Sequence, residues 1–262
     1  MTEEQCRKAL SQSNYFGTML VKMGKADCLL GGATYSTADT VRPALQLIKT
    51  KPGNKIVSSC FILVRGDEKI AMGDCAINID PSEDDLVEIA IESAKTAKVF
   101  GIDPKVAMLS YSTLGSGKGP SVTKVANATK KIKEAAPDLA VEGEIQFDAS
   151  VSPDVASIKC PGSPVAGQAN TFIFPDINAG NIGYKIASRL GGYTAVGPVL
   201  QGLNAPINDL SRGCTAEEVY SMSIVTAALS VPEEQEEVNE ADLEAIVRTV
   251  VATFIAAKKL KK

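Results

Sequence analysis

Hydrophobic positions change period repeatedly along this chain, and the changes predict strands and helices in turn. Short apolar runs bounded by turn residues predict strands at 27–33, 105–111, 140–147, 171–175 and 194–199. Apolar residues spaced three or four apart predict helices at 2–24, 37–49, 83–100, 120–135, 153–159, 178–191 and 215–229. This alternation favours an α/β fold with mostly parallel sheets.

Two segments break the alternation. Residues 55–80 (KIVSSCFILVRGDEKIAMGDCAINID) contain two apolar runs joined by a tight turn at Arg65–Glu68, which predicts a β-hairpin that adds an antiparallel edge to the sheet. Residues 231–244 are acidic without a basic residue and predict a solvated linker. Beyond them, helical spacing of apolar residues predicts an amphipathic helix at 241–257. We expect that helix to dock on its own domain or on a second subunit rather than on a membrane.

Composition excludes several classes of protein. The 262 residues are 45% hydrophobic and carry a net charge of −4, so the chain has a sizeable core and no global basic field for nucleic acid or an anionic membrane. The six cysteines are scattered without a C-x-x-C pair, which indicates reduced thiols rather than disulfides or a zinc site. With no signal-like N-terminus and no long apolar run, we expect a cytoplasmic protein.

The absence of histidine is the compositional feature that most restricts the possible catalytic mechanisms. It excludes Ser-His and Cys-His activation of a nucleophile and every histidine-ligated metal. Proton transfer must therefore come from carboxylates, lysines, tyrosines or thiols. We expect no metal and no permanently bound cofactor.

Three loops after predicted strands are rich in Gly, Ser and Asn, at 110–121, 175–183 and 197–213. Ligands of open α/β sheets bind at the carboxyl ends of the strands, and amide groups at helix N-termini favour anions. Each loop alone is more typical of a connector, but together they predict a site for an anionic ligand. None matches the spacing of a P-loop or of a dinucleotide-binding fingerprint.

Candidate ligand contacts lie in these loops and beside Pro43. Arg42 is a candidate phosphate contact, with a surface ion pair as the alternative. The candidates at the loop tips are Ser116, Lys118, Asn178 and Asn181.

The segment NDLSRGCTAEEVY, residues 208–220, concentrates reactive side chains before a predicted helix. Ser211 and Arg212 supply a hydroxyl and a guanidinium, and Cys214 supplies a thiol that a helix N-terminus would activate. Glu218 has two interpretations. With Thr215 as N-cap it completes a capping box. Alternatively it accepts a proton, although a carboxylate is a weak base towards a thiol that titrates near pH 8.5.

Long blocks of the chain resemble phosphate acetyltransferase (phosphotransacetylase) over roughly residues 1–229. They include YFGTMLVKMGKADCLLGGATYSTADTVRPALQLIKTKPG, SYSTLGSGKGPSVTKVANATK, VEGEIQFDASVSPDVA, PGSPVAGQANTFIFPDINAGNIGYKIASRLGG and GPVLQGLNAPINDLSRGCTAEEVY. The resemblance implies reversible acetyl transfer between acetyl phosphate and coenzyme A, the latter as a substrate, by a homodimer. It also implies two α/β domains akin to isocitrate/isopropylmalate dehydrogenase, with the active site in the cleft between them.

The expected domains come from this resemblance. Residues 1–49 and 192–230 are expected to form one domain, 50–191 the other, and 231–262 the acidic linker and terminal helix. Met1 aligns inside the family sequence, so we expect an N-terminally truncated domain that lacks its first βα units and a substrate-binding arginine. Whether this impairs activity is left open.

The resemblance also implies roles for residues. Ser211 donates to the acyl carbonyl oxygen, Arg212 neutralises phosphate, and Glu218, commonly Asp in the family, deprotonates the thiol. Because transfer is direct in the family, Cys214 is expected to contact substrate rather than to form an acyl-enzyme. Two alternatives remain: a non-catalytic module that binds acyl-CoA or acyl phosphate, and an acyltransferase of the phosphate butyryltransferase kind.

Overall fold

A computed structural model describes residues 2–231, which divide into two compact units. The first unit contains the residues up to Lys49 and those from Leu203 on, and the second is Thr50–Gly202. The second unit is therefore continuous in sequence, whereas the first is assembled from two separate segments. The predicted terminal helix and nearly all of the predicted acidic linker lie outside the described residues.

The second unit is built on a six-stranded sheet in the order β5-β4-β6-β3-β2-β7. Neighbours from β5 to β3 are parallel, and β2 is antiparallel to both β3 and β7. The strands are β2 (Ser58–Arg65), β3 (Glu68–Gly73), β4 (Lys105–Leu109), β5 (Ala140–Ile145), β6 (Thr171–Ile173) and β7 (Thr194–Gln201).

The predicted hairpin forms, with Arg65 paired to Glu68 across the turn, but its expected position at the sheet edge is wrong. Strand β3 pairs with β6 and β2 pairs with β7, so the hairpin lies inside the sheet. The burial of β2 explains this position: residues 58–63 are buried without alternation, which an edge strand facing solvent would not allow.

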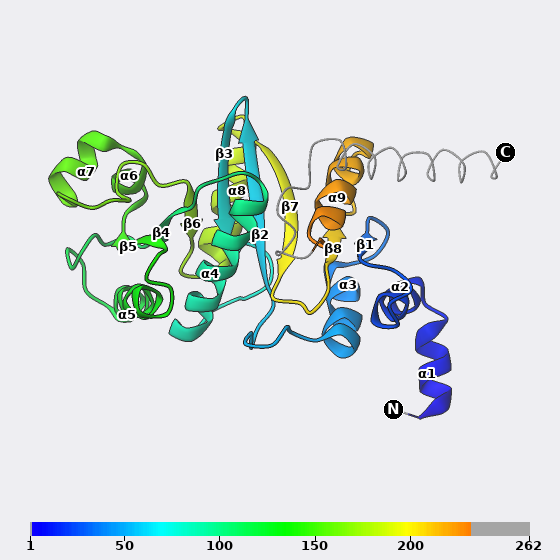
Figure 1. The fold of residues 1–262 in the computed structure, drawn as a ribbon. Coiled ribbons are helices and arrows are strands. Elements are labelled where there is room, and N and C mark those ends of the chain that lie inside the picture. Colours follow the sequence, from blue (N-terminus) through cyan, green and yellow to red (C-terminus); the bar gives the residue numbers. More distant parts are fainter. Residues whose placement is uncertain (1, 232–262) are drawn as a thin grey trace. The chain divides into compact units, whose positions relative to one another are not determined.

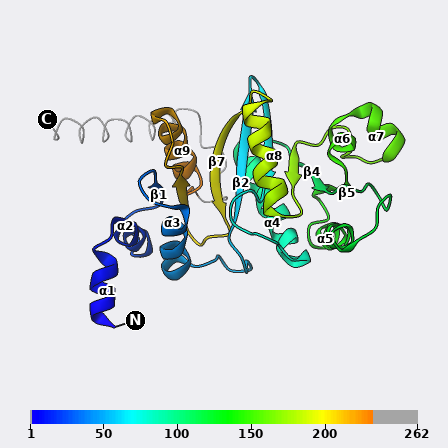
Figure 2. The ribbon, with the colours of Figure 1, turned by 180° about the vertical axis from the view of Figure 1, so that it is seen from behind.

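Helices cover both faces of this sheet. Helices α4 and α5 pack on one face against Val106 and Met108, whereas the alternate residues Ala107 and Leu109 face the core that α8 covers. Figures 1 and 2, seen from opposite sides, show α4 and α8 on opposite faces. The helices of this unit are α4 (Glu83–Val99), α5 (Pro120–Ala135), α6 (Phe147–Val151), α7 (Pro153–Lys159) and α8 (Ile177–Arg189).

The first unit contains one parallel pair of strands, in which Leu29 lies opposite Ile207 and Gly32 opposite Leu210. Helices α2, α3 and α9 pack against this pair (Figure 1). The elements are α1 (Glu3–Leu10), α2 (Ser13–Lys22), β1 (Leu29–Gly32), α3 (Thr37–Pro43), the π-helix η1 (Ala44–Ile48), β8 (Ile207–Leu210) and α9 (Ala216–Ala228).

Several predicted boundaries differ from the structure. The single helix predicted at 2–24 is two helices, because Ser11 turns its hydroxyl onto the carbonyl of Lys8 and ends α1. Strand β8 lies inside a predicted loop. The expected domain boundary at residue 192 differs by one strand, because β7 pairs with β2 and so lies in the sheet of the second unit.

No helix within residues 2–231 combines the length and the apolar character needed to cross a bilayer.

Strands β1 and β8 approach each other closely at Gly32. A Cβ atom at this position would lie 2.4 Å from the carbonyl oxygen of Leu210 and 2.6 Å from Oδ1 of Asp209. The φ angle of Gly32 is also +90°, a conformation that side chains rarely adopt. Only glycine therefore allows the two strands to pair at their carboxyl ends.

Replacing Gly32 by alanine should lower the free energy of unfolding of this unit by about 1–3 kcal/mol, through backbone strain and the clash with β8. Chemical denaturation measures the loss. Gly24→Ala is the matched control, because Gly24 has a φ of +65° but no atom of the described residues lies within 4 Å of its Cβ position. Equal losses in the two variants would show that the close approach to β8 has no energetic weight.

Candidate functional site

The residues proposed from the sequence fall into two groups, one in each unit. Arg42, Ser211, Arg212, Cys214 and Glu218 belong to the first unit, and the other four belong to the second. Those four are Ser116, Lys118, Asn178 and Asn181.

In the first unit the parallel pairing of β1 and β8 determines where the loops lie. The carboxyl ends of the two strands lie side by side, so the loops at 33–36 and 211–215 leave the same edge. The first loop leads into α3, which carries Arg42, and the second contains Ser211 and Arg212. This is the edge at which α/β proteins bind ligands.

Ser211 is exposed and is held in a tight turn. Its carbonyl oxygen accepts from the amide of Cys214 at 3.0 Å, and its Oγ accepts from the amide of Gly213 at 3.3 Å. A hydroxyl carries one donor proton in addition to its lone pairs. Since Gly213 occupies a lone pair only, and no residue within 2–231 accepts from this hydroxyl, the proton of Ser211 is open to a ligand oxygen.

Arg212 is exposed next to Ser211, and among residues 2–231 its side chain makes no hydrogen bond or ion pair. A guanidinium offers five N–H donors in a planar fork that matches phosphate. The charge at this strand edge is therefore not neutralised by a described protein group and is open to an anion.

Arg42 forms the surface ion pair that was its alternative interpretation, with 3.7 Å between Nη1 and Oδ1 of Asp39. Asp39 is mainly engaged with Ser36, and the hydrogen bonds from Ser36, more than the charge of Arg42, lower the pKa of the Asp39 carboxyl. Solvent screens an exposed pair at this separation, so the pair contributes little to stability. Arg42 can therefore exchange Asp39 for a ligand at little cost.

The capping box predicted at α9 is present. Oε2 of Glu218 accepts from the amide of Thr215 at 2.6 Å, and the Thr215 hydroxyl accepts from the amide of Glu218 at 3.2 Å. The carboxylate is exposed, and the cap occupies only one of its two oxygens. Capping and proton transfer by Glu218 are thus geometrically compatible.

The cysteines differ sharply in accessibility. Burial raises the pKa of the Cys60 thiol to about 12 and that of Cys75 well above its usual range, so both stay protonated at neutral pH. Cys214 is half-buried in the turn after Ser211. Of these three thiols, only Cys214 lies beside the candidate site.

In the second unit the glycine-rich loop after β4 uses its own amides internally. The amide of Gly115 donates to the carboxylate of Glu144 at 2.6 Å, and the amide of Gly117 donates to the hydroxyl of Ser112 at 2.8 Å. That hydroxyl donates in turn to Glu144 at 3.0 Å. Glu144 is only 4% exposed, so a protein carboxylate occupies the position at which the sequence suggested a ligand anion.

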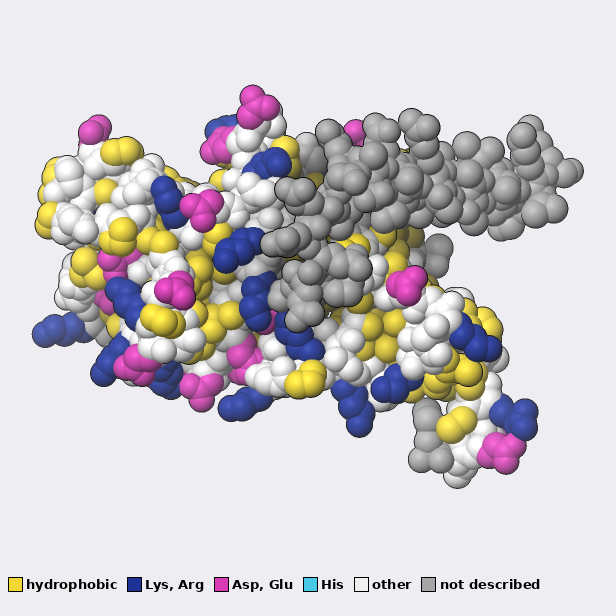
Figure 3. Space-filling model, in the orientation of Figure 1, with side chains coloured by type: hydrophobic (Ala, Val, Ile, Leu, Met, Phe, Trp, Pro, Cys, Tyr) yellow, Lys and Arg dark blue, Asp and Glu magenta, His cyan; other side chains and the backbone are white. Residues whose placement is uncertain are grey.

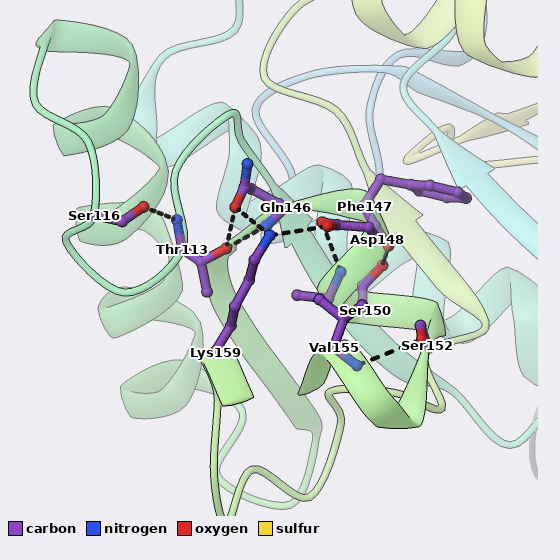
Figure 4. A network of polar contacts seen from close by, with 10 residues as sticks. Thr113, Ser116, Gln146, Phe147, Asp148, Ser150, Ser152, Val155 and Lys159 are labelled. Atoms are coloured by element: carbon purple, nitrogen blue, oxygen red, sulfur yellow. Dashed lines mark hydrogen bonds and ion pairs between the residues drawn. The ribbon is translucent and has the colours of Figure 1, made fainter. Parts of the chain in front are cut away.

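Figure 4 shows how the same loop is tied to α6 and α7. The amide of Thr113 donates to the hydroxyl of Ser116 at 3.0 Å, and the Thr113 hydroxyl accepts from the amide of Gln146 at 3.0 Å. Lys159 reaches from the end of α7 to Gln146 at 3.0 Å and to Asp148 at 2.9 Å. Ser116 therefore helps to shape the loop.

The remaining candidates of this unit are of two kinds. Asn181 is committed to the protein, because its Nδ2 donates to the carbonyl oxygen of Cys75 at 3.0 Å and fastens α8 to the loop after β3. Lys118 and Asn178 are exposed, and their side chains make no hydrogen bond or ion pair in the part of the chain that the structure describes.

Charge on the surface of this unit is mixed. Positive and negative side chains alternate over α4 and α5 (Figure 3). Lys131 pairs with Glu83 at 3.1 Å and with Asp84 at 2.7 Å, and Lys124 pairs with Asp80 at 2.7 Å. The two signs largely neutralise each other on this face. Among the described residues, no cluster of three His, Cys, Asp or Glu could hold a metal ion.

Sequence reasoning missed the buried carboxylates of residues 2–231, and two of them, Glu144 and Asp209, matter for the candidate site. Each stands at the carboxyl end of a strand in a polar context, in EGEIQ and in INDLS respectively. An acidic residue within or beside a short apolar strand was the available signal, since such a group is buried only when it is hydrogen-bonded.

Fold and site together define an α/β protein with a hydroxyl and a guanidinium, the latter without a partner in the described part of the chain, at the carboxyl edge of a parallel strand pair. The profile of the "Phosphate acetyl/butaryl transferase" family matches residues 1–227. This chain belongs to that family, which confirms the resemblance seen in the sequence.

Named relatives agree with this assignment. A phosphate acetyltransferase from Bacillus subtilis (strain 168) is 62% identical over 227 residues, covering 87% of this chain and 70% of that protein. One from Staphylococcus aureus (strain Mu50 / ATCC 700699) is 59% identical over 231 residues, with the same two shares. The crystal structure of a phosphotransacetylase from Streptococcus pyogenes has a TM-score of 0.86 at 59% identity, covering 87% of this chain and 70% of that one.

Replacing Glu144 by leucine should loosen the glycine-rich loop, because the amide of Gly115 would lose a charged acceptor. Hydrogen–deuterium exchange at 112–118 should become faster by about tenfold or more. Glu142→Leu is the matched control. Glu142 lies on the same strand but pairs with Lys133 instead of the loop. Unchanged exchange in the Glu144 variant would mean that the carboxylate does not hold the loop.

Proposed function

We propose that this chain catalyses the reversible transfer of an acetyl group between acetyl phosphate and coenzyme A. Family membership and relatives named phosphate acetyltransferase at 62% and 59% identity support the proposal. The single structural observation that carries it is that Arg212 and the hydroxyl proton of Ser211 lie side by side with no partner among residues 2–231.

The reaction has three chemical requirements. The coenzyme A thiolate attacks the acyl carbon, a C–S bond forms, and the C–O bond to phosphate breaks with its electron pair leaving on phosphate. The carbonyl oxygen gains negative charge on the way, so it needs a hydrogen-bond donor. The leaving phosphate needs a cation, and the thiol needs a proton acceptor.

Residues of the first unit meet the first two requirements. Ser211 donates its hydroxyl proton to the developing oxyanion, an interaction typically worth about 3–4 kcal/mol of the barrier. Arg212 neutralises the phosphate through two N–H groups. Arg42 adds a second guanidinium, which leaves its weak pair with Asp39 at 3.7 Å.

Glu218 is proposed as the proton acceptor. Its Oε2 is held by Thr215, which orients the carboxylate, and its second oxygen is left for the thiol proton. One carboxylate oxygen of Glu218 thus caps the helix, and the other is proposed to accept the proton. Transfer is direct, so Cys214 contacts substrate without forming an acyl-enzyme.

Of the four candidate residues in the second unit, two are proposed to contact the ligand directly. Lys118 and Asn178 are exposed, their side chains have no partner in the described part of the chain, and they suit the phosphates and polar groups of coenzyme A. Ser116 and Asn181 do not contact the ligand in this proposal. They hold the glycine-rich loop and helix α8 in place.

Further expectations accompany the proposed activity. Coenzyme A is a substrate, and no permanent cofactor is required. We propose that the protein is a homodimer in the cytoplasm. A reducing compartment suits its six free cysteines. Because the family includes butyryl as well as acetyl transfer, butyryl phosphate is the second substrate to assay.

Replacing Arg212 by alanine should lower kcat/KM for acetyl phosphate by roughly 100-fold, because the leaving phosphate loses its cation. The measurement is formation of acetyl-CoA from acetyl phosphate and coenzyme A. Arg7→Ala is the control, since Arg7 only pairs with Glu3 on the exposed helix α1. If the wild-type chain binds coenzyme A without turnover, the enzyme assignment fails in favour of a binding module.

Glu218→Gln and Thr215→Ala separate catalysis from capping. Glutamine keeps the capping geometry but cannot take a proton, so kcat should fall roughly 100-fold or more while thermal stability is kept. Thr215→Ala should instead lower stability by about 0.5–2 kcal/mol and keep kcat. A Glu218→Gln variant with wild-type kcat would rule out the base.

A further inference from the structure

Asp209 is a buried carboxylate that the proposed chemistry does not use. It lies on β8, two residues before Ser211, and is 1% exposed. A carboxylate in the interior requires strong hydrogen-bond partners, since its desolvation is costly. The identity of those partners shows what the residue holds together.

Both partners of Asp209 come from one helix. The hydroxyl of Thr37 donates to Oδ2 at 2.6 Å, and the hydroxyl of Thr40 donates to Oδ1 at 2.6 Å. The two threonines lie on the same face of α3, one turn apart. Within residues 2–231 no cation pairs with Asp209, so these hydroxyls are its only charge-stabilising side chains.

Gly32 makes this arrangement possible from the other side. A Cβ atom at position 32 would lie 2.6 Å from Oδ1 of Asp209, so the bare backbone of β1 leaves the space that the carboxylate fills. The end of β1, the end of β8 and the first turn of α3 therefore meet at one carboxylate.

The position of this carboxylate matters because both elements that it joins lead to candidate site residues. Strand β8 continues directly into Ser211 and Arg212, and α3 carries Arg42 two residues after Thr40. Burying a carboxylate costs desolvation energy that hydrogen bonds must offset, so its burial is weak evidence for a role in stability. The role that the contacts indicate for Asp209 is to hold α3 in a fixed position against the end of β8.

We propose that Asp209 is a positioning residue of the phosphate-binding site. Its carboxylate fastens α3 to the end of β8, and so fixes the helix that carries Arg42 relative to the turn that carries Ser211 and Arg212. The proposal rests on the proposed acetyl transfer, in which both guanidiniums face the phosphate. It assigns the effect to acetyl phosphate rather than to coenzyme A.

The test compares Thr37→Val, which removes one hydroxyl and keeps the shape, with Thr37→Ser, which keeps the hydroxyl. KM for acetyl phosphate should rise by about tenfold in the valine variant and recover in the serine variant, while KM for coenzyme A changes little. Asp209→Asn should shift the acetyl phosphate KM in the same direction. Thr18→Val removes another buried hydroxyl of this unit, which donates to the carbonyl oxygen of Asn14, and should change stability only.

The outcomes separate the two proposals. An inactive wild-type chain overturns the proposed function. An active wild type with an unchanged acetyl phosphate KM in Thr37→Val and Asp209→Asn overturns the role of Asp209 alone. A rise shared equally by both substrates, or the same rise in Thr18→Val, also overturns it, because a general loss of structure would then explain the effect.

Discussion

The parallel pairing of β1 with β8 is the constraint on which the first unit depends. These strands are separated by more than the whole second unit in sequence, yet Gly32 and Leu210 lie opposite each other. The pairing fixes the position of the strand end that Ser211 and Arg212 directly follow. Without a glycine at position 32, the strands could not approach at that edge, and the buried carboxylate of Asp209 would have no space.

Carboxylates accept the amides of loops and of a helix N-terminus in the second unit. Glu144 receives the amide of Gly115, and Asp74 receives the amides of residues 76–78. Asp176 caps α8 through the amides of Asn178 and Ala179. Amides that could have bound phosphate are therefore already used by the protein. In a chain without histidine, recognition of anions then falls to guanidinium and ammonium groups.

Local patterns in the sequence were sufficient for most elements. Helix α4 begins after Ser82 as expected, α7 begins at Pro153, and the hairpin turns at Arg65–Glu68. Strand β8 was not predictable in this way, because its buried residues Asn208 and Asp209 are polar and gain their partners from remote segments. For the same reason the sequence offered candidate site residues, but not the carboxylates that hold the neighbouring loops and helix.

The division of the chain has a consequence for synthesis on the ribosome. Residues 50–202 contain every strand of the six-stranded sheet, and the amide of Lys51 closes onto the carbonyl oxygen of Gly202 at 2.9 Å. That unit can complete its sheet as soon as it has emerged. Strand β1, although made earlier, must wait for β8. The first unit, whose N-terminal segment is synthesised first, therefore forms its strand pair only after the segment that leads to Ser211 and Arg212 has been made.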